Sequence, residues 1–309
     1  MPSAFIVLQL NQLQKHFNMT GYYAQLLTNG IIAGSIYAMF AVGLALVYGV
    51  FRFINFSHGE LITWGAYLAL MFSTAPFSLP LYFAVIPALF ITVGIGLAQD
   101  RFVYRPLRQS NPIAILIASI GLSYMLRNVI RLFWGSDMQT FDLPLSVGLQ
   151  FFGVYITRVQ ILMMSAALLF FCILYFLLTR TLLGKSLRAV SDDMELSAIM
   201  GINMKKVTWT IWVLASVFAA SGGILLALDT NLDPMMGMNS LIKAFAAVLI
   251  GGAGNVWGAL IGGLFIGIAE NLSVAFISPD YKDFISYSLI FILLLFKPRG
   301  IFGISGGVR

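Results

Sequence analysis

Long apolar runs separated by short polar stretches dominate the chain, and their lengths predict helices that cross a membrane. A crossing α-helix needs about 20 apolar residues, because each residue adds about 1.5 Å and the hydrocarbon core is about 30 Å thick. The runs are 26–51, 61–72, 80–99, 112–134, 159–179, 207–228, 241–253, 256–277 and 284–296. We therefore expect an all-α, polytopic transmembrane helical bundle with about eight crossings plus short broken segments.

The two shortest runs inside the chain lie at similar places in its two halves, and each adjoins a polar or glycine-rich stretch. "NFSHGE" (55–60) comes before 61–72, and "GGAGN" (251–255) closes 241–253. Short or interrupted helices at matching positions in two halves indicate a transporter's substrate path. Backbone that leaves helical geometry at membrane depth must be buried in protein or line a wet cavity.

"RFINFSHGE" (52–60) places several polar side chains between two apolar runs. One interpretation is a turn in which Asn55 or Ser57 caps the next helix. The other is a broken helix whose polar groups face a substrate path. The second interpretation predicts that a set of polar and aromatic residues lies on or near that path: Tyr48, Asn55, Phe56, Ser57, His58 and Asn255. A metal site is not expected, because His58 and Glu60 alone supply too few ligands.

Basic residues gather in alternate loops, which predicts the orientation of the chain. Lys and Arg mark cytoplasmic loops of membrane proteins. They gather in 100–108, in 180–206 and at the C-terminus, whereas the loops between these segments contain Asp137, Asp142, Asp229, Asp233, Asp280 and Asp283. We therefore expect 180–206 and the C-terminus in the cytoplasm. The side on which the N-terminus lies is left open.

Composition removes the soluble alternatives. The chain has 309 residues, of which 60% are hydrophobic and 10% charged, whereas soluble domains are about 25% charged. The net charge of +6 does not indicate a nucleic-acid partner, because basic residues in membrane proteins mark loops. Residues 1–23 lack the pattern of a signal peptide and are expected to form an extension with an interfacial helix. A single cysteine, Cys172, allows no intrachain disulfide.

Glycines recur every fourth residue at Gly254, Gly258 and Gly262. At that spacing they share one helical face and let another helix approach closely. We expect them to serve helix packing within the subunit. A seam between two subunits is the alternative.

The segment 184–207, "GKSLRAVSDDMELSAIMGINMKKV", is the longest polar stretch of the C-terminal half. Its pattern predicts two short helices, with Ser191 or Asp192 capping the second and Gly201 ending it in a left-handed turn. Met194, Leu196, Ile199 and Met200 offer apolar side chains to a partner. A helix lying on the lipid surface is the alternative.

The sequence gives little support for an arrangement of residues typical of an enzyme. Asp192, Asp193 and Glu195 have no second cytoplasmic acidic cluster with which to hold a metal-bound diphosphate. No phosphate-binding P-loop is present, so the chain cannot hydrolyse ATP by that route. A self-sufficient channel or ion-coupled carrier is the remaining alternative. A carrier needs a buried carboxylate, for which Glu60 and Glu270 are the candidates.

Two arginines, Arg127 and Arg131, lie one helical turn apart near the outer end of the run 112–134. We expect them to reach the membrane interface or to pair with Asp137. Binding of a substrate carboxylate is the alternative.

Several segments resemble the permeases of high-affinity branched-chain amino acid ABC importers, and among these the H-type subunit. The resemblance covers most of 28–303. It rests on "NGIIAGSIYAMFAVGLALVYGVFRFINFSHGELITWGAY" (29–67), "RPLRQSNPIAILIASIGLSYMLRN" (105–128), "GKSLRAVSDDMELSAIMGIN" (184–203), "AFAAVLIGGAGNVWGALIGGLFIGIAEN" (244–271) and "FKPRGIFG" (296–303). It implies a permease domain over 24–303, followed by a cytoplasmic tail, 304–309.

The resemblance implies an alternating-access importer of the bacterial inner membrane. Its partners would be a second related permease, two cytoplasmic ATPase subunits that bind ATP and Mg²⁺, and a periplasmic or extracellular solute-binding protein. The chain itself would bind no cofactor. A coupling helix within 180–206 would dock on an ATPase through Asp193, Glu195, Leu196, Ile199, Met200 and Gly201. The expected solute is a branched-chain or other neutral amino acid, with urea or a short amide as the alternative.

Overall fold

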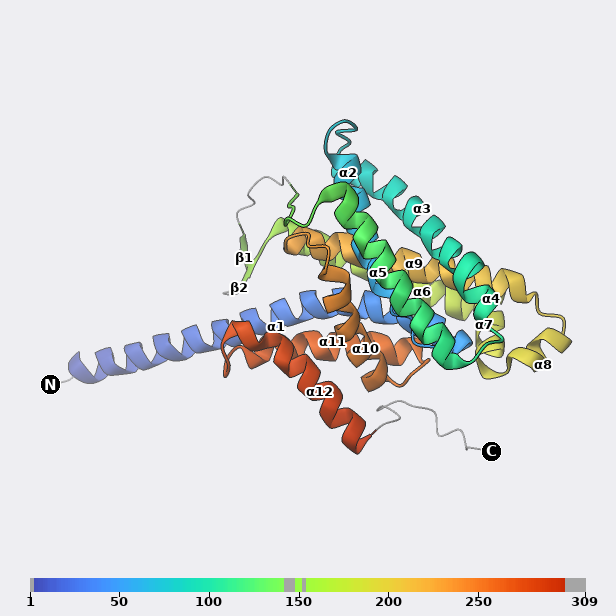
Figure 1. Ribbon diagram of the computed structural model, residues 1–309. Helices are drawn as coiled ribbons and strands as arrows, with labels where there is room; N and C mark the ends of the chain where they lie inside the picture. The colour runs from blue at the N-terminus through green and yellow to red at the C-terminus, as the bar shows by residue number, and fades with distance from the viewer. Residues whose placement is uncertain (1–2, 142–147, 152–153, 298–309) are drawn as a thin grey trace.

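The computed structural model describes residues 3–141, 148–151 and 154–297, and most of these are helical (Figure 1). The predicted tail, 304–309, and the basic residues Arg299 and Arg309 lie outside the described residues. The elements in chain order are α1 (Ser3–Phe51), α2 (His58–Ser73), α3 (Leu81–Gln99), a π-helical turn η1 (Asp100–Tyr104), α4 (Arg105–Leu107), α5 (Pro112–Trp134), β1 (Leu149–Phe151), β2 (Val154–Ile156), α6 (Arg158–Arg180), α7 (Leu182–Asp192), α8 (Met194–Ile199), α9 (Met204–Asp229), α10 (Met236–Gly251), α11 (Val256–Ser273), a 3₁₀ turn η2 (Pro279–Tyr281) and α12 (Lys282–Phe296).

Helix lengths separate two classes of membrane helix. Within the described residues, six helical stretches are long and apolar enough to cross a membrane, namely Gly21–Phe51, Leu81–Leu107, Pro112–Trp134, Arg158–Arg180, Met204–Asp229 and Val256–Ser273. Three apolar helices are shorter: α2 and α10 have 16 residues each, and α12 has 15. Full-length crossings are thus fewer than the eight expected. The two short runs of the sequence are the short helices α2 and α10.

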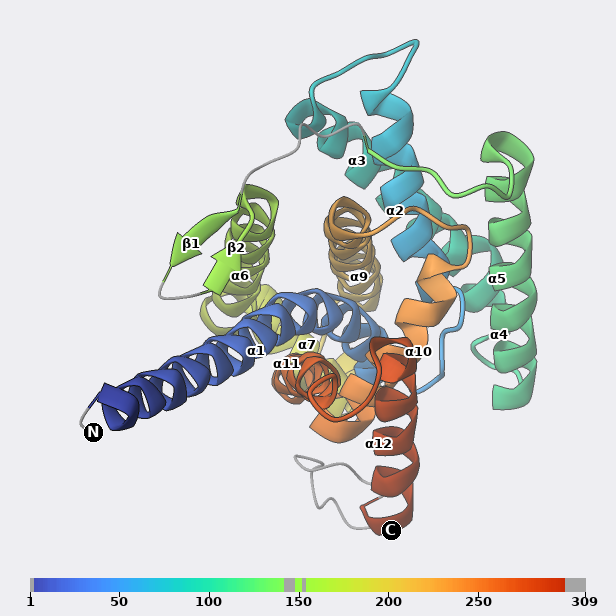
Figure 2. The ribbon, with the colours of Figure 1, turned by 90° about the vertical axis from the view of Figure 1, so that its left-hand side faces the viewer.

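Helix α1 is the centre of the bundle. It packs against α9, α10 and α11, and Figure 2 shows it lying between α9 and α11. Helix α11 runs antiparallel along it, because Gly30 of α1 lies against Ile268 and Gly49 lies against Gly254. Helix α1 also passes through the predicted boundary at residue 23 without a break.

The bundle has two distinct ends. Helices α7 and α8 lie at one end, and the β1–β2 hairpin lies at the other (Figure 1). Gln25 of α1 holds the hairpin, because its side chain accepts from the backbone N–H of Tyr155 at 2.7 Å and donates to the Tyr155 carbonyl at 3.0 Å. We call the end with α7 and α8 the basic end, after Lys185 and Arg188. The end with the hairpin, Asp229, Asp280 and Asp283 is the acidic end.

Candidate functional site

The connection between α1 and α2 turns back into the interior of the protein. Helix α1 ends at Phe51, where Arg52 takes a left-handed conformation with φ 56°. Helix α2 begins at His58, whose Nε2 lies 3.3 Å from the carbonyl oxygen of Phe40. Phe40 lies about 16 Å along α1 from its end, at 1.5 Å per residue. Helix α2 therefore starts beside α1 about three turns before α1 ends, inside the bundle.

Buried polar side chains surround this connection, residues 52–57, which we call the break. The hydroxyl of Ser57 lies 2.8 Å from Asn55 Oδ1, 2.8 Å from Gln99 Oε1 and 2.6 Å from the Tyr104 hydroxyl, which also donates to Asn55 Oδ1 at 2.8 Å. All four side chains are buried, and we call them the Asn55 cluster. Among the described residues, Asn55 Nδ2 and Gln99 Nε2 have no hydrogen-bond partner. Because an unpaired buried donor is costly, these two amides are available to an acceptor that enters the break.

Aromatic rings cover the cluster. Phe53 lies 4.9 Å from the Tyr104 ring, which stacks on Trp212 at 5.3 Å between centroids. Phe56 lies 5.7 Å from Phe245 of α10. Tyr48 is half-buried on α1, and its carbonyl accepts from the Arg52 N–H. Asn55, Phe56, Ser57 and His58 therefore lie at this break, and Tyr48 lies in the last turn of α1 before it.

Asn255 lies elsewhere. It caps α11, where its Oδ1 accepts from the N–H groups of Trp257 and Gly258 at 3.1 Å. It lines a cavity of about 290 Å³ at the basic end, beside Ser191 of α7. The structure therefore does not bring Asn255 together with the Asn55 cluster, because α11 meets α1 near Gly49 rather than near the start of α2.

The glycines of α11 pack against helices of the same chain. A Cβ on Gly258 would meet the backbone of Gly251, and one on Gly262 would meet the backbone of Ala247, both in α10. Gly254 precedes α11 rather than sharing its face, and its φ of 89° requires the left-handed conformation. These close approaches lie within the chain and leave no seam for a second subunit at Gly258 and Gly262.

Both candidate carboxylates for ion coupling are paired. Glu60 Oε1 lies 2.5 Å from Arg127 Nη2 and accepts a hydrogen bond from the Ser123 hydroxyl at 2.8 Å. These two contacts join α2 to α5. The prediction that Arg127 pairs with Asp137 is therefore wrong. Glu270 Oε1 lies 2.7 Å from Lys243 Nζ. Within the described residues, no group of three or more His, Cys, Asp or Glu side chains is placed to hold a metal ion.

A short exposed helix forms the tip of the basic end. Helix α8 follows α7 directly, and Asp193 rather than Ser191 or Asp192 caps it, accepting from the Leu196 N–H at 2.9 Å. Gly201 ends the turn with φ 85°, as its sequence context predicted. The exposed residues here include Asp193, Met194, Glu195, Leu196 and Ala198. Ile199 and Met200 are 81% and 76% exposed, so this tip presents apolar side chains on the surface.

Two hydrogen bonds connect this end to the break. The Arg52 guanidinium donates to the carbonyl of Ser191 at 3.0 Å, and the Ser191 hydroxyl donates to the Gly49 carbonyl at 2.9 Å. The end of α7 is therefore joined to the last turn of α1, just before the chain turns back into the bundle.

Sequence reasoning missed four of the residues that shape these sites: Gln99, Tyr104, Ser123 and Lys243. The signal for Lys243 was present, because a lysine within an apolar run of a membrane protein marks a functional or paired position. Gln99 and Tyr104 lie at the end of an apolar run and close on the break only through the packing of α3 against α2 and α9.

Known proteins are similar along nearly the whole chain. Residues 26–294 match the family model described as "Branched-chain amino acid transport system / permease component". The chain is 34% identical over 295 residues to the "High-affinity branched-chain amino acid transport system permease protein BraD" of Pseudomonas aeruginosa, an alignment that covers 91% of this chain and 96% of that protein.

Two further relatives carry related names. The chain is 33% identical over 297 residues to the "High-affinity branched-chain amino acid transport system permease protein LivH" of Escherichia coli strain K12, covering 91% of this chain and 96% of that protein. It is 28% identical over 304 residues to the "Probable branched-chain amino acid transport permease protein LivH" of Methanocaldococcus jannaschii, covering 91% of this chain and 92% of that protein.

Proposed function

The chain belongs to the branched-chain amino acid transport permease family, and from this premise we propose that it is the membrane-spanning subunit through which an ATP-driven importer moves branched-chain or other neutral amino acids. A solute-binding protein delivers the amino acid at the acidic end. A second related permease completes the path, and two ATPase subunits supply the energy at the basic end. ATP and Mg²⁺ belong to those subunits, and this chain hydrolyses nothing.

The observation that carries the proposal is the break between α1 and α2. Helix α2 starts beside α1 about three turns before α1 ends, and Asn55, Ser57 and His58 are fully buried there, which places polar groups at membrane depth. Such groups are expensive in a membrane unless protein or water satisfies them, and they mark solute pathways. The amides of Asn55 and Gln99, which have no partner in the described part of the chain, offer donors to a solute carboxylate, while Phe53 and Phe56 supply apolar contacts.

Helix α8 supports docking on an ATPase. The apolar side chains of Leu196 and Ile199, and of Met200 directly after the helix, are exposed at the basic end, which the positive-inside rule assigns to the cytoplasm and not to the lipid tails. The bonds of Arg52 and Ser191 join the same end to the break. A displacement of α8 by an ATPase would therefore reach the end of α1 and the buried polar cluster.

The ion-coupled carrier is the weaker alternative. Such a carrier needs an intramembrane carboxylate that takes up and releases an ion or a proton. Glu60 is fully buried against Arg127, and Glu270 is buried against Lys243. Permanent cationic partners oppose both steps, so an external energy source such as ATP fits this chain better.

Purification of the assembled complex tests the proposal. The tagged chain is extracted from its native membranes in mild detergent, and its partners are identified by mass and stoichiometry. We expect one copy of a second permease and two ATPase copies, with ATP hydrolysis that rises when a leucine-loaded binding protein is added. Urea or a short amide in place of leucine should give no rise.

Two results would argue against the proposal. A chain that purifies alone or only as a homodimer, with no ATPase, would contradict the heteromeric importer. A rise in hydrolysis with urea and none with leucine would keep the importer but replace the solute.

A further inference from the structure

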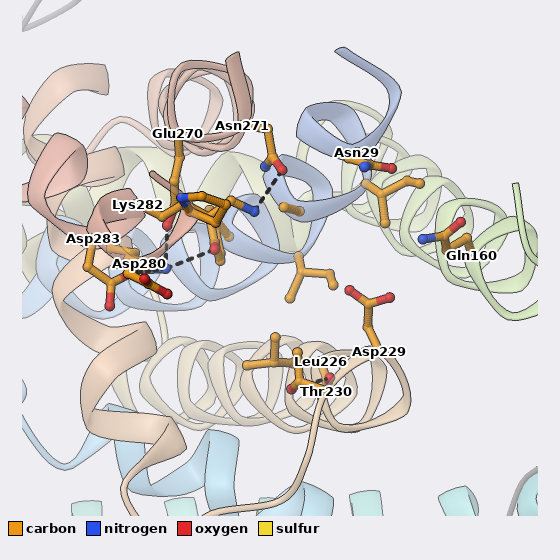
Figure 3. Close-up of a pocket in the computed structure, with 16 residues that line it drawn as sticks. Asn29, Gln160, Leu226, Asp229, Thr230, Glu270, Asn271, Asp280, Lys282 and Asp283 are labelled. Carbon is orange, nitrogen blue, oxygen red and sulfur yellow. Dashed lines mark hydrogen bonds and ion pairs between the residues drawn. The ribbon is translucent and has the colours of Figure 1, made fainter. Parts of the chain in front are cut away.

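A polar cavity opens at the acidic end, away from the break. It has a volume of about 390 Å³, which is in the range of small-ligand sites, about 300–1,000 Å³. Its walls come from the middle of α1, from the ends of α6, α9 and α11, from α10, and from η2 with the start of α12 (Figure 3). The cavity therefore lies where a solute arriving at the acidic end first meets the bundle.

One wall of the cavity is a fixed network of charges. Lys243 Nζ lies 2.7 Å from Glu270 Oε1, 2.8 Å from Asp283 Oδ1 and 3.0 Å from the Tyr37 hydroxyl. The two carboxylates more than neutralise the single ammonium group. Lys282 Nζ lies 3.1 Å from Asn271 Oδ1, which leaves donor capacity on this second ammonium group.

The opposite wall is acidic and polar. Figure 3 shows Asp229 reaching toward the cavity from α9, with Gln160 and Asn29 beside it on neighbouring helices. Four carboxylates and two ammonium groups line the whole cavity, so its formal charge is −2. The field inside therefore attracts a positively charged group.

A buried carboxylate oxygen lacks a donor. Glu270 is 2% exposed, and its Oε2 has no hydrogen-bond partner among the described residues, while Oε1 is held by Lys243. A buried carboxylate without its full set of donors is costly. An ammonium group supplies three donors and a positive charge, which is the chemistry that this wall lacks.

We propose that this cavity is an entry site for the zwitterionic amino acid, in which the carboxylates of Asp229 and Glu270 hold the ammonium group and Lys282 holds the carboxylate. The inference rests on the proposed function and deepens it. Neutral urea and short amides carry no ammonium group, so the cavity selects against them. Leu226 and Ile36, which also line it, contact the apolar side chain of the solute.

Thiol protection tests the site directly. Thr230 is exposed and lines the cavity, so the Thr230→Cys variant is made in a Cys172→Ala background, which removes the exposed native thiol. The assembled complex, in lipid nanodiscs without binding protein, reacts with a polar thiol reagent. Leucine at about nine times its Kd should slow the reaction by about tenfold, because it occupies about nine-tenths of the sites.

Two comparisons make the result specific. The same concentration of 4-methylpentanoate, which is leucine without its amino group, should not slow the reaction. Adding Asp229→Asn should raise the leucine concentration needed for protection by about tenfold, the loss of one charged hydrogen bond. The matched control, Asp137→Asn, removes an exposed carboxylate outside the cavity and should leave protection unchanged.

The outcomes separate this inference from the proposed function. Absence of protection by leucine, or equal protection by 4-methylpentanoate, would overturn the entry site whether or not the complex transports leucine. Uptake of leucine by the same complex is measured in parallel, and it decides the proposed function independently of the protection result.

Discussion

At the scale of single residues, ionic partners replace water inside the bundle. Arg127 contacts Glu60 through Nε at 3.2 Å and through Nη2 at 2.5 Å, and the two side chains are 6% and 0% exposed. Removing one member of a buried pair leaves an uncompensated charge, whereas removing both leaves none. This asymmetry makes the role of the pair measurable.

The Arg127→Met variant should be less stable by about 3–5 kcal/mol, because Glu60 then stays buried without its cation. Unfolding of the purified complex in mixed micelles, by titration with a denaturing detergent, measures the difference. The matched variant that combines Glu60→Gln with Arg127→Met should recover most of the loss. Equal stability of the single variant and the parent would show that the pair contributes nothing.

Arg52 offers a second test at this scale. Glycine adopts the left-handed conformation of Arg52 without steric cost, so a glycine can replace it without disturbing the backbone. Arg52→Gly keeps the turn and removes the bond to Ser191. We expect leucine uptake per ATP hydrolysed to fall about twofold to fivefold, the equivalent of one hydrogen bond of about 0.5–1 kcal/mol. Ser191→Ala removes the second bond and should act in the same direction. An unchanged ratio of uptake to hydrolysis in both variants would remove this link from the coupling route.

At the scale of elements, glycines set how closely α11 approaches its neighbours. Helix α11 lies on α10 through Gly258 and Gly262, and on α1 through Gly263 and Gly267. A membrane helix packs mainly by van der Waals contact, because lipid tails are as apolar as its side chains. Small residues therefore decide which helices meet.

Gly262→Ala should destabilise the complex by about 1–3 kcal/mol, because the new Cβ would meet the backbone of Ala247. Gly121→Ala is the matched control, since a Cβ there meets no described atom within 4 Å. Gly121→Ala should be neutral or slightly stabilising. Detergent-unfolding curves for the two variants decide the point, and similar losses in both would refute the packing role.

The turn after α8 is a separate element-scale test. Gly201→Val places a β-branched residue at φ 85°, which is strained whatever the surrounding space. We expect it to reduce the ATPase recovered with the complex by severalfold. Gly201→Asn is the control, because asparagine tolerates the left-handed region. Recovery of the ATPase with Gly201→Val at the level of the parent would mean that this turn does not form the docking surface.

Run lengths in the sequence predicted the two short helices, because the number of apolar residues limits how far a helix can reach. The left-handed turn at Gly201 was predictable for the same local reason. The cap of α8 moved by one residue to Asp193, since helix boundaries depend on local geometry that patterns resolve poorly.

The sequence alone did not predict which residues of different helices lie together. Arg127 was expected to pair with the nearby Asp137, but the packing of α5 on α2 brings it to Glu60, on a different helix. Asn255 was expected beside the Asn55 cluster, and the antiparallel course of α11 along α1 carries it to the basic end instead. Such pairings depend on how helices pack, which no single segment encodes.

At the scale of the whole molecule, the sites lie in a consistent order along the bundle. The charged cavity opens at the acidic end, the buried break lies beside the last three turns of α1, and the exposed tip of α8 lies at the basic end. An importer needs solute entry, a path and an energy input in this order. The account therefore predicts that solute and ATP act from opposite ends.

Leucine uptake into sealed proteoliposomes that contain the complete complex tests this account most directly. The account predicts uptake only when leucine-loaded binding protein faces the acidic end and ATP faces the basic end, with no uptake when either is omitted or placed on the other side. Leucine entry without ATP, or entry through this chain reconstituted without ATPase subunits, would contradict it.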